Sequence, residues 1–259
     1  MADYIEGKRP VIEAFRTGVP MRRILIGDFV KRDGMIEDIM RKAKRYKVPV
    51  EMVPRKALED RSVRGSHQGV MAEAKPFAYV GIGEVIDAAT QSAEQREGAA
   101  LVVLLDHITD AGNLGALARS AEAVGASGLV IPNKRSARVD AATYKSSAGA
   151  ISHMPVAQVS NLVQAISRLQ EAGFWVVAAT EHASDVLWDV NMKGKIALVM
   201  GNEHEGVSRL VLENCDLFGK LPMAGEVASL NVAQAATACM YEWLRQNAGS
   251  WLSGGQSSC

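Results

Sequence analysis

Three short polar stretches carry side chains that could bind and orient a ligand. They are Asn113 and Arg119 within residues 106–121 (DHITDAGNLGALARSA), Glu203 within residues 201–209 (GNEHEGVSR), and Ser229 and Asn231 at the end of residues 221–231 (LPMAGEVASLN). Amides, a guanidinium and a carboxylate form hydrogen bonds and ion pairs with polar substrates. These residue types predict a binding site. The alternative is that they cap helices and brace turns.

The third stretch precedes a long apolar helix, predicted up to residue 246. Ser229 is predicted to be the N-cap of this helix, because a serine hydroxyl accepts from the free N–H groups of the first turn. Asn231 then falls inside the first turn, where asparagine lowers helix propensity and is not needed for the cap. A polar residue without a structural role indicates ligand binding. The alternative is that Asn231 only braces the loop.

Motifs of several other chemistries are missing. The GNLG turn lacks a full G-x-G-x-x-G, and the chain contains no GxxxxGK[ST], G-x-S-x-G or H-E-x-x-H sequence. Cys215, Cys239 and Cys259 have no metal-ligand spacing and do not indicate thiol catalysis. For His107 and His204, which lie within the polar stretches, a structural or hydrogen-bonding role is favoured over general-base catalysis.

The elements that must position these residues form two groups. Residues 1–76 predict a small α/β domain, with helices over 11–18, 33–46 and 55–62 and strands over 22–27, 49–54 and 68–75. Residues 77–98 are assigned mainly to a linker, although 82–93 could form a helix. Residues 99–248 predict a second domain, and residues 249–259 a disordered tail.

The second domain alternates strands and helices. Strands are predicted at 101–106, 128–132, 154–159, 174–180 and 195–201, and helices at 114–124, 141–147, 162–172, 208–214 and 230–246. This alternation predicts a doubly wound parallel sheet. Ligands bind beyond the carboxyl ends of such strands, where Asn113, Glu203 and Asn231 all fall. A shared site is therefore expected.

Composition limits the class of protein. The hydrophobic fraction of 48% suffices for packed cores. No apolar run approaches the roughly 20 residues of a membrane span, the N-terminus does not read as a signal peptide, and the three cysteines are scattered, so a reduced, cytoplasmic protein is expected. The formal net charge is zero, yet residues 1–75 hold 17 Lys and Arg against 11 Asp and Glu, a balance of +6. Residues 76–259 balance it with −6. A basic front part favours a polyanionic partner, although solvated helix faces would also account for it.

The three stretches, in this order, resemble the three motifs of the SpoU/TrmH family of RNA ribose 2′-O-methyltransferases in the SPOUT class. EGKRPVIEAFRTG and SHQGVMAEA resemble the family's L30e-like RNA substrate-binding domain. With that domain present, the likeness is greatest to large-subunit rRNA guanosine-2′-O-methyltransferases. One departure is Ala111, where the family has proline in its D-P-x-N sequence.

The resemblance implies a deep trefoil knot in the C-terminal domain, a homodimer, and S-adenosylmethionine as the cofactor, with S-adenosylhomocysteine as product and no metal. It implies cofactor binding by Thr180, Gly201, Leu221, Met223 and Leu230. It implies catalytic roles for Asn113, Arg119, Glu203, Ser229 and Asn231. In the RGSHQG loop, Arg64, His67 and Gln68 are candidates for RNA contact, with a turn brace as the alternative.

A methyl transfer to a ribose hydroxyl needs the acceptor to be positioned and its developing charge stabilised. The resemblance makes Arg119 the activating residue. Because arginine keeps its proton in proteins, we expect it to clamp a phosphate and stabilise the alkoxide rather than act as a base, with Glu203 hydrogen-bonded to it. Alternatives are methylation of tRNA or another rRNA nucleotide, a non-enzymatic rRNA-binding assembly factor, and a dinucleotide-dependent oxidoreductase, which the missing fingerprint disfavours.

Overall fold

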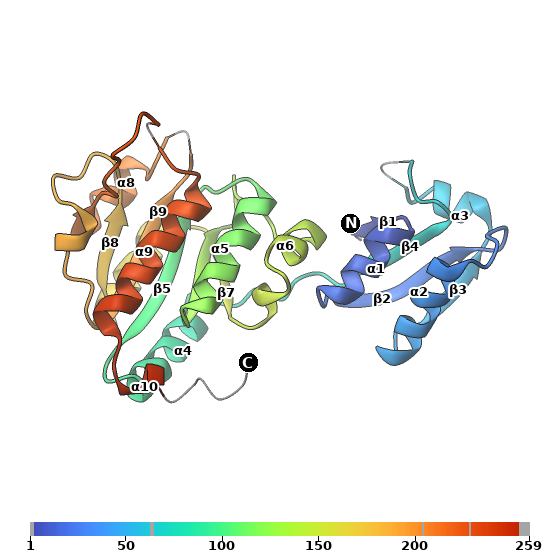
Figure 1. The fold of residues 1–259 in the computed structure, drawn as a ribbon, viewed down its shortest axis with the longest axis horizontal. Helices are drawn as coiled ribbons and strands as arrows, with labels where there is room; N and C mark the ends of the chain where they lie inside the picture. Colours follow the sequence, from blue (N-terminus) through green and yellow to red (C-terminus); the bar gives the residue numbers. More distant parts are fainter. Residues whose placement is uncertain (1–2, 63–64, 204, 228, 254–259) are drawn as a thin grey trace.

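The computed structural model describes residues 3–62, 65–203, 205–227 and 229–253. The chain forms two α/β units joined by an extended segment (Figure 1). Within the described residues, no helix combines the length and apolar character that crossing a bilayer requires.

The N-terminal unit is a four-stranded sheet with helices on both faces. Its elements are β1 (Tyr4–Glu6), α1 (Lys8–Arg16), β2 (Met21–Gly27), α2 (Gly34–Arg45), β3 (Val50–Val53), α3 (Arg55–Glu59) and β4 (Val70–Ala74). The strand order is β1-β4-β2-β3, and only β2 and β3 are parallel. Helices α1 and α2 bury their apolar sides on one face, and α3 packs Leu58 against Leu25 and Met71 on the other.

The C-terminal unit is built on a parallel sheet, as predicted. Its elements are α4 (Ile82–Gln95), β5 (Ala100–Asp106), α5 (Ala111–Ala123), β6 (Gly128–Pro132), α6 (Ala141–Ser146), η1 (Ala150–Ser152), β7 (Val156–Val159), α7 (Leu162–Glu171), β8 (Trp175–Ala179), η2 (Leu187–Asp189), β9 (Lys195–Gly201), α8 (Arg209–Leu212), β10 (Leu217–Gly219), α9 (Val232–Asn247) and α10 (Ser250–Ser253). The strands run in the order β10-β8-β9-β5-β6-β7, every pair parallel.

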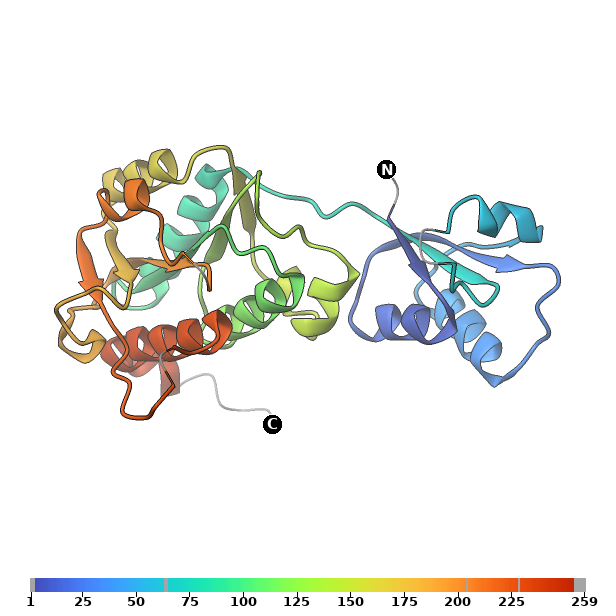
Figure 2. The same ribbon diagram turned by 90° about the horizontal axis from the view of Figure 1, so that it is seen from above.

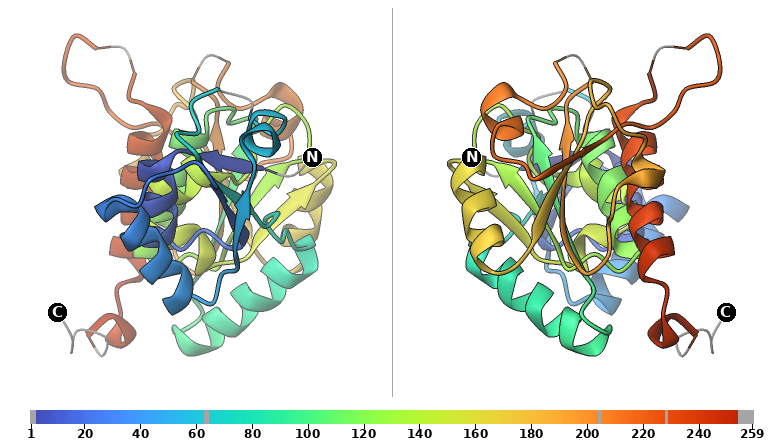
Figure 3. Two further views of the ribbon diagram at one scale, coloured as in Figure 1. Left: turned by 90° about the vertical axis from the view of Figure 1, so that its right-hand side faces the viewer. Right: turned by 90° about the vertical axis from the view of Figure 1, so that its left-hand side faces the viewer.

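Helices cover both faces of this sheet (Figures 2 and 3). Helices α5 and α9 pack on one face, against Leu101, Val103 and Leu105 of β5. Helices α4 and α7 pack on the other, against Val102 and Leu104 of the same strand. Because both faces are buried, residues 100–105 of the strand are all apolar instead of alternating with polar residues.

Some elements differ from the expectation. The two three-residue strands β1 and β10 were not predicted, because so few residues carry no periodicity. Residues 77–98 contain α4, whose Ile82, Val85 and Ala89 join the core of the C-terminal unit. Within the predicted tail, residues 250–253 form α10, and residues 254–259 lie outside the described chain. The domain boundaries and the knot stay predictions.

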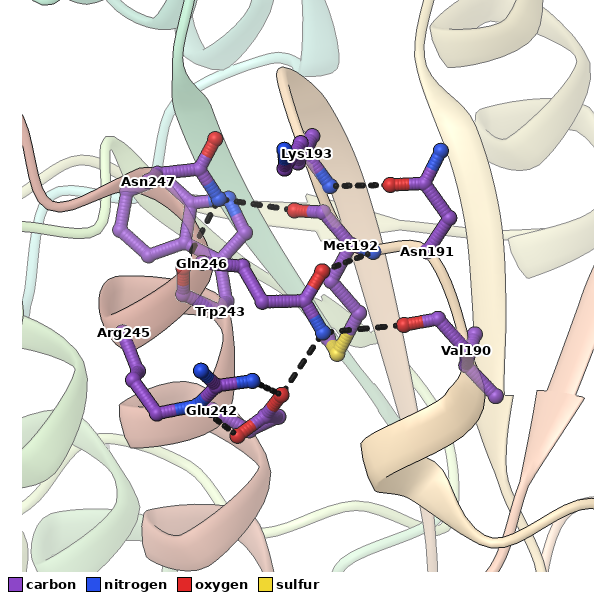
Figure 4. A network of polar contacts seen from close by, with 9 residues as sticks. All are labelled: Val190, Asn191, Met192, Lys193, Glu242, Trp243, Arg245, Gln246 and Asn247. Carbon is purple, nitrogen blue, oxygen red and sulfur yellow. Dashed lines mark hydrogen bonds and ion pairs between the residues drawn. The ribbon is translucent and has the colours of Figure 1, made fainter.

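Two side-chain amides fasten the end of α9 to the segment before β9 (Figure 4). Gln246 accepts from the Met192 N–H at 2.8 Å and donates to the Val190 carbonyl at 3.0 Å. Asn247 accepts from the Gly194 N–H at 2.7 Å and donates to the Met192 carbonyl at 2.8 Å. Each amide thus pairs with backbone as a neighbouring strand would. These bonds hold the end of α9 at the amino ends of the strands, while the helix begins at their carboxyl ends.

Candidate functional site

A pocket of about 260 Å³ lies at the carboxyl ends of β8 and β9, under the loop 221–231. Its lining includes all five residues expected to hold a cofactor: Thr180, Gly201, Leu221, Met223 and Leu230. Met223 and Leu230 are 42% and 43% exposed, so both offer apolar surface to a ligand. The structure therefore brings together residues from three distant stretches of sequence.

The loop after β9 forms one wall of this pocket. Asn202 and Gly206 exchange backbone hydrogen bonds of 3.2 and 3.1 Å, which hold these two residues side by side. A Cβ atom at Gly201 would overlap the backbone of Gly206 and Val207. Glycine at this position therefore lets the backbone of the loop after β9 pass close to the end of the strand.

A buried carboxylate supports the same edge of the sheet. Asp106, at the end of β5, is 1% exposed. Its Oδ2 accepts from the backbone N–H of Ser208 at 2.7 Å, and its Oδ1 lies 2.5 Å from Nδ1 of His107. Asp106 was not predicted to have a role from the sequence. An aspartate that directly follows an apolar strand could have indicated one. The hydrogen-bonding role favoured for His107 is observed, and His204 lies outside the described residues.

Glu203, Asn113 and Asn231 form a continuous polar chain beside the pocket. Asn113 donates through Nδ2 to Oε1 of Glu203. Asn231 donates through Nδ2 to Oδ1 of Asn113 at 3.0 Å. Asp110 holds the start of α5 in place, because its Oδ1 accepts from the Asn113 N–H at 2.7 Å. The expectation that these three residues share a site therefore agrees with their geometry.

The predicted cap of α9 was wrong. The helix begins at Val232 with Asn231 as its N-cap, and Oδ1 of Asn231 accepts from the N–H groups of Ala233 and Gln234 at 2.9 and 3.4 Å. Asparagine caps as well as serine does, so the two candidates could not be ranked by residue type. Asn231 thus has the structural role that it was expected to lack. Ser229 is exposed and lines the pocket.

Arg119 lies on the exposed side of α5, outside the pocket lining. The expected hydrogen bond between Arg119 and Glu203 is not found within the described residues, where Glu203 accepts from Asn113 instead. The neighbouring Ser120 shares a hydrogen bond of 2.7 Å with Thr237 and so joins α5 to α9. Arg119 itself is exposed to solvent.

The chemistry of the pocket does not involve an activated thiol. Cys239 lines it, but burial raises the pKa of its thiol to about 12, so the thiolate is scarce at neutral pH. Among the residues that the structure describes, no cluster of histidine, cysteine and carboxylate side chains could hold a metal ion.

The candidate RNA contacts lie in the loop before β4. Arg64 is outside the described residues. Nδ1 of His67 accepts from the Gly69 N–H at 3.0 Å, which is the turn brace considered as the alternative. Gln68 is exposed and has a φ of 51°, a left-handed conformation uncommon for a side chain of this size.

Two protein-family models match the chain. The model of the SpoU rRNA methylase family covers residues 100–241. A model described as the substrate-binding part of RNA 2′-O ribose methyltransferases covers residues 4–80.

Known proteins match over nearly the whole chain. YacO from Bacillus subtilis, named as a TrmH family tRNA/rRNA methyltransferase, is 37% identical over 94% of this chain and 96% of its own. A TrmH family tRNA/rRNA methyltransferase of Staphylococcus haemolyticus is 38% identical over 93% and 95%. The SpoU methyltransferase AviRb from Streptomyces viridochromogenes, solved with AdoMet, is 27% identical and superposes with a TM-score of 0.68, over 96% and 91% of the two chains. The protein belongs to the SpoU family of RNA methyltransferases.

Proposed function

We propose that this protein transfers a methyl group from S-adenosylmethionine to the ribose 2′-hydroxyl of a guanosine in large-subunit (23S) rRNA. The observation that carries the proposal is the polar chain of Glu203, Asn113 and Asn231 at the rim of a half-apolar pocket. Such a site holds an amphipathic ligand and orients a polar group beside it.

The pocket residues suit the cofactor. Leu221, Met223 and Leu230 would pack against an adenine ring, and the Thr180 hydroxyl would bond to polar atoms of the ligand. AviRb, which shares this fold, was solved in complex with AdoMet. When bound, S-adenosylmethionine would supply the methyl group: the bond from carbon to sulfur breaks as the bond from carbon to the ribose oxygen forms, the hydroxyl proton passes to water, and S-adenosylhomocysteine is left.

The polar residues would position the acceptor. Asn113 and Asn231 are fixed by each other and by Glu203, so their orientation is set before the RNA arrives. Ser229 would bond to the ribose. Because the guanidinium of Arg119 stays protonated, it would bind a phosphate of the target nucleotide and stabilise the developing alkoxide.

We propose a cytoplasmic homodimer as the working form. The support is that Arg119 is exposed and does not line the pocket of its own subunit, which is the arrangement expected if Arg119 serves the pocket of a second copy. Most apolar residues of α9 are unavailable for a dimer interface, because Ala236, Cys239 and Met240 are buried in the core. Tyr241, half-exposed on the same helix, remains a candidate for the interface.

Complementation tests the shared site. A mixture of the Arg119→Ala and Asn231→Ala proteins, co-expressed and purified by two tags, should regain part of the activity that each homodimer lacks. Inactive mixtures would show that Arg119 acts within its own subunit.

The N-terminal unit would supply RNA affinity. Its balance of +6 over residues 1–75 favours phosphate contacts, which give affinity rather than sequence choice. Deletion of residues 1–75 is expected to abolish rRNA methylation and to spare cofactor binding. Full activity of the truncated chain would contradict this role.

The decisive experiment is methylation of unmodified rRNA with labelled S-adenosylmethionine, followed by mapping of the modified ribose. We expect label on one guanosine of large-subunit rRNA. Arg119→Ala should lose activity and Arg119→Lys should regain little of it, because lysine lacks the two-pronged geometry of the guanidinium. Label on tRNA, which the names of the relatives include, would select the alternative substrate. RNA binding without any label would select the non-enzymatic assembly factor.

A further inference from the structure

Three cations lie close together in a part of the chain that is otherwise acidic. Residues 76–259 hold 12 Lys and Arg against 18 Asp and Glu, yet Lys134, Arg135 and Arg138 fall within five positions. They belong to the loop between β6 and α6. All three side chains are exposed, and none forms an ion pair with a carboxylate within the described residues.

Four of the other side chains of this loop have structural roles. Ala137 and Val139 are each 7% exposed and anchor the loop in the core. Ser136 donates to the Ile108 carbonyl at 3.2 Å, and Asp140 accepts from the Thr143 N–H at 3.0 Å as the N-cap of α6. Buried and hydrogen-bonded residues therefore anchor the loop, while Asn133 and the three cations are exposed.

The loop is joined to the candidate site. The N–H of Ala137 donates to the Ile108 carbonyl at 2.7 Å, and Ile108 lies in the loop that leads from β5 to Asn113. Because β5, β6 and β9 are parallel neighbours, their carboxyl ends share one edge, and the cations lie on the edge that carries Glu203.

The loop is also joined to the connection between the two units. The N–H of Val139 donates to the Tyr79 hydroxyl at 2.8 Å, and Tyr79 belongs to the segment that connects β4 to α4. The loop leads into α6, which packs against α1 and lies between α5 and the N-terminal unit (Figure 1). An RNA held by both units would pass over this position.

We propose that Lys134, Arg135 and Arg138 form a cationic loop that binds phosphates of the RNA next to the target nucleotide. The inference rests on the proposed function and adds a binding surface to it. The exposed carboxylates of Asp110, Glu203 and Glu205 near the site would repel a polyanion, and the positive charge of the loop would offset this repulsion. Anchored on two sides, the cations are presented to the RNA with little further ordering.

A double variant with a matched control tests the loop. Lys134→Ala/Arg138→Ala removes two loop cations, and Arg168→Ala/Lys193→Ala removes two exposed cations from α7 and from the segment before β9. Affinity for an unmodified large-subunit rRNA transcript is measured by filter binding over a series of salt concentrations. The logarithm of the RNA association constant falls linearly with the logarithm of the salt concentration. Each lost phosphate contact makes this slope shallower by about 0.7 for a single strand. The loop variant should therefore lose about 1.4 in slope and on the order of tenfold in affinity at 0.15 M salt.

The controls separate failure of this inference from failure of the proposed function. S-adenosylmethionine binding and Tm should be unchanged in both double variants, and Lys134→Arg/Arg138→Lys should bind RNA as the wild type does. If the wild type binds and methylates RNA while both double variants lose affinity equally, the loop assignment is overturned and the proposed function stands. If the wild-type protein neither binds nor methylates the rRNA transcript or a tRNA transcript, both the loop assignment and the proposed function are overturned.

Discussion

Asn231 combines a helix cap with a link in the polar site, and two substitutions separate these roles. Its side-chain oxygen accepts from Ala233 and Gln234, while its amide nitrogen donates to Asn113 at 3.0 Å. In Asn231→Ser, the hydroxyl keeps the capping bond but is too short to reach Asn113. In Asn231→Ala, both interactions are lost. A comparison of the two variants therefore isolates the cap.

The magnitudes follow from the two interactions. Loss of an N-cap costs about 1 kcal/mol, and an exposed neutral hydrogen bond contributes about 0.5 kcal/mol. We expect Asn231→Ala to lower the free energy of unfolding by about 1.5 kcal/mol and Asn231→Ser by about 0.5 kcal/mol. The difference corresponds to roughly 2–4 °C in Tm for a chain of this length. Methyl transfer should fall in both variants alike, on the order of 10²-fold, because both lose the link that orients Asn113.

Thermal unfolding by circular dichroism gives the stabilities, and label transfer to RNA gives the activities. Gln234→Ala is a matched control, because Gln234 is exposed in the same helical turn. Equal Tm values for the Ser and Ala variants would refute the capping assignment. Full activity of Asn231→Ser would refute the functional role of the bond to Asn113, whatever its effect on stability.

The remaining predictions concern other parts of the C-terminal unit. Asn247→Ala, which breaks the two hydrogen bonds from Asn247 to the segment before β9 (Figure 4), should lower the free energy of unfolding in urea by about 2 kcal/mol. The hydrogen bond from Arg245 lowers the pKa of Glu242, so the stability that this pair contributes is complete above the ordinary carboxyl pKa of 4.5 and is lost as the pH falls through the depressed value. Glu242→Gln should therefore make unfolding less sensitive to pH below about 4.5, in urea titrations across that range. Gly201→Ala should abolish cofactor binding in calorimetry, because its Cβ would overlap the loop after β9, whereas Gly225→Ala, with no atom within 4 Å of the added carbon, should bind normally.

Long, strongly patterned elements could be predicted from the sequence. β5 and β9 are seven-residue strands that are apolar except for Asp106 at the end of β5 and Lys195 at the start of β9, and α2 has a capping aspartate, Asp33, at its start. The segment 77–98 was harder to assign, because α4 is amphipathic and its apolar side becomes evident only against the sheet that it covers. Residues 250–253 had no such pattern, and their helix was missed.

The site was predictable as a set of residues but not as a set of bonds. Strand order brings Asn113, Glu203 and Asn231 to one edge, which the parallel-sheet rule allows one to expect. Asn113 is 90 positions from Glu203 and 118 positions from Asn231. Local sequence rules do not predict which side chains will form hydrogen bonds across such separations. The predicted pair of Glu203 and Arg119 was wrong for this reason. Opposite charge favoured it, but the fold places the amide of Asn113 against the Glu203 carboxylate.

The position of α9 shows how stability and site geometry depend on the same contacts. Its apolar side is buried against the sheet, but apolar burial is non-directional and would tolerate a shift along the helix axis. Hydrogen bonds fix that position at the start, middle and end of the helix, through Asn231 to Asn113, Thr237 to Ser120, and Asn247 to the segment before β9. A slip of one turn, about 5.4 Å, would break all three sets at once. The polar anchors therefore set the axial position of Asn231, and with it the geometry of the site, while the core supplies most of the stability.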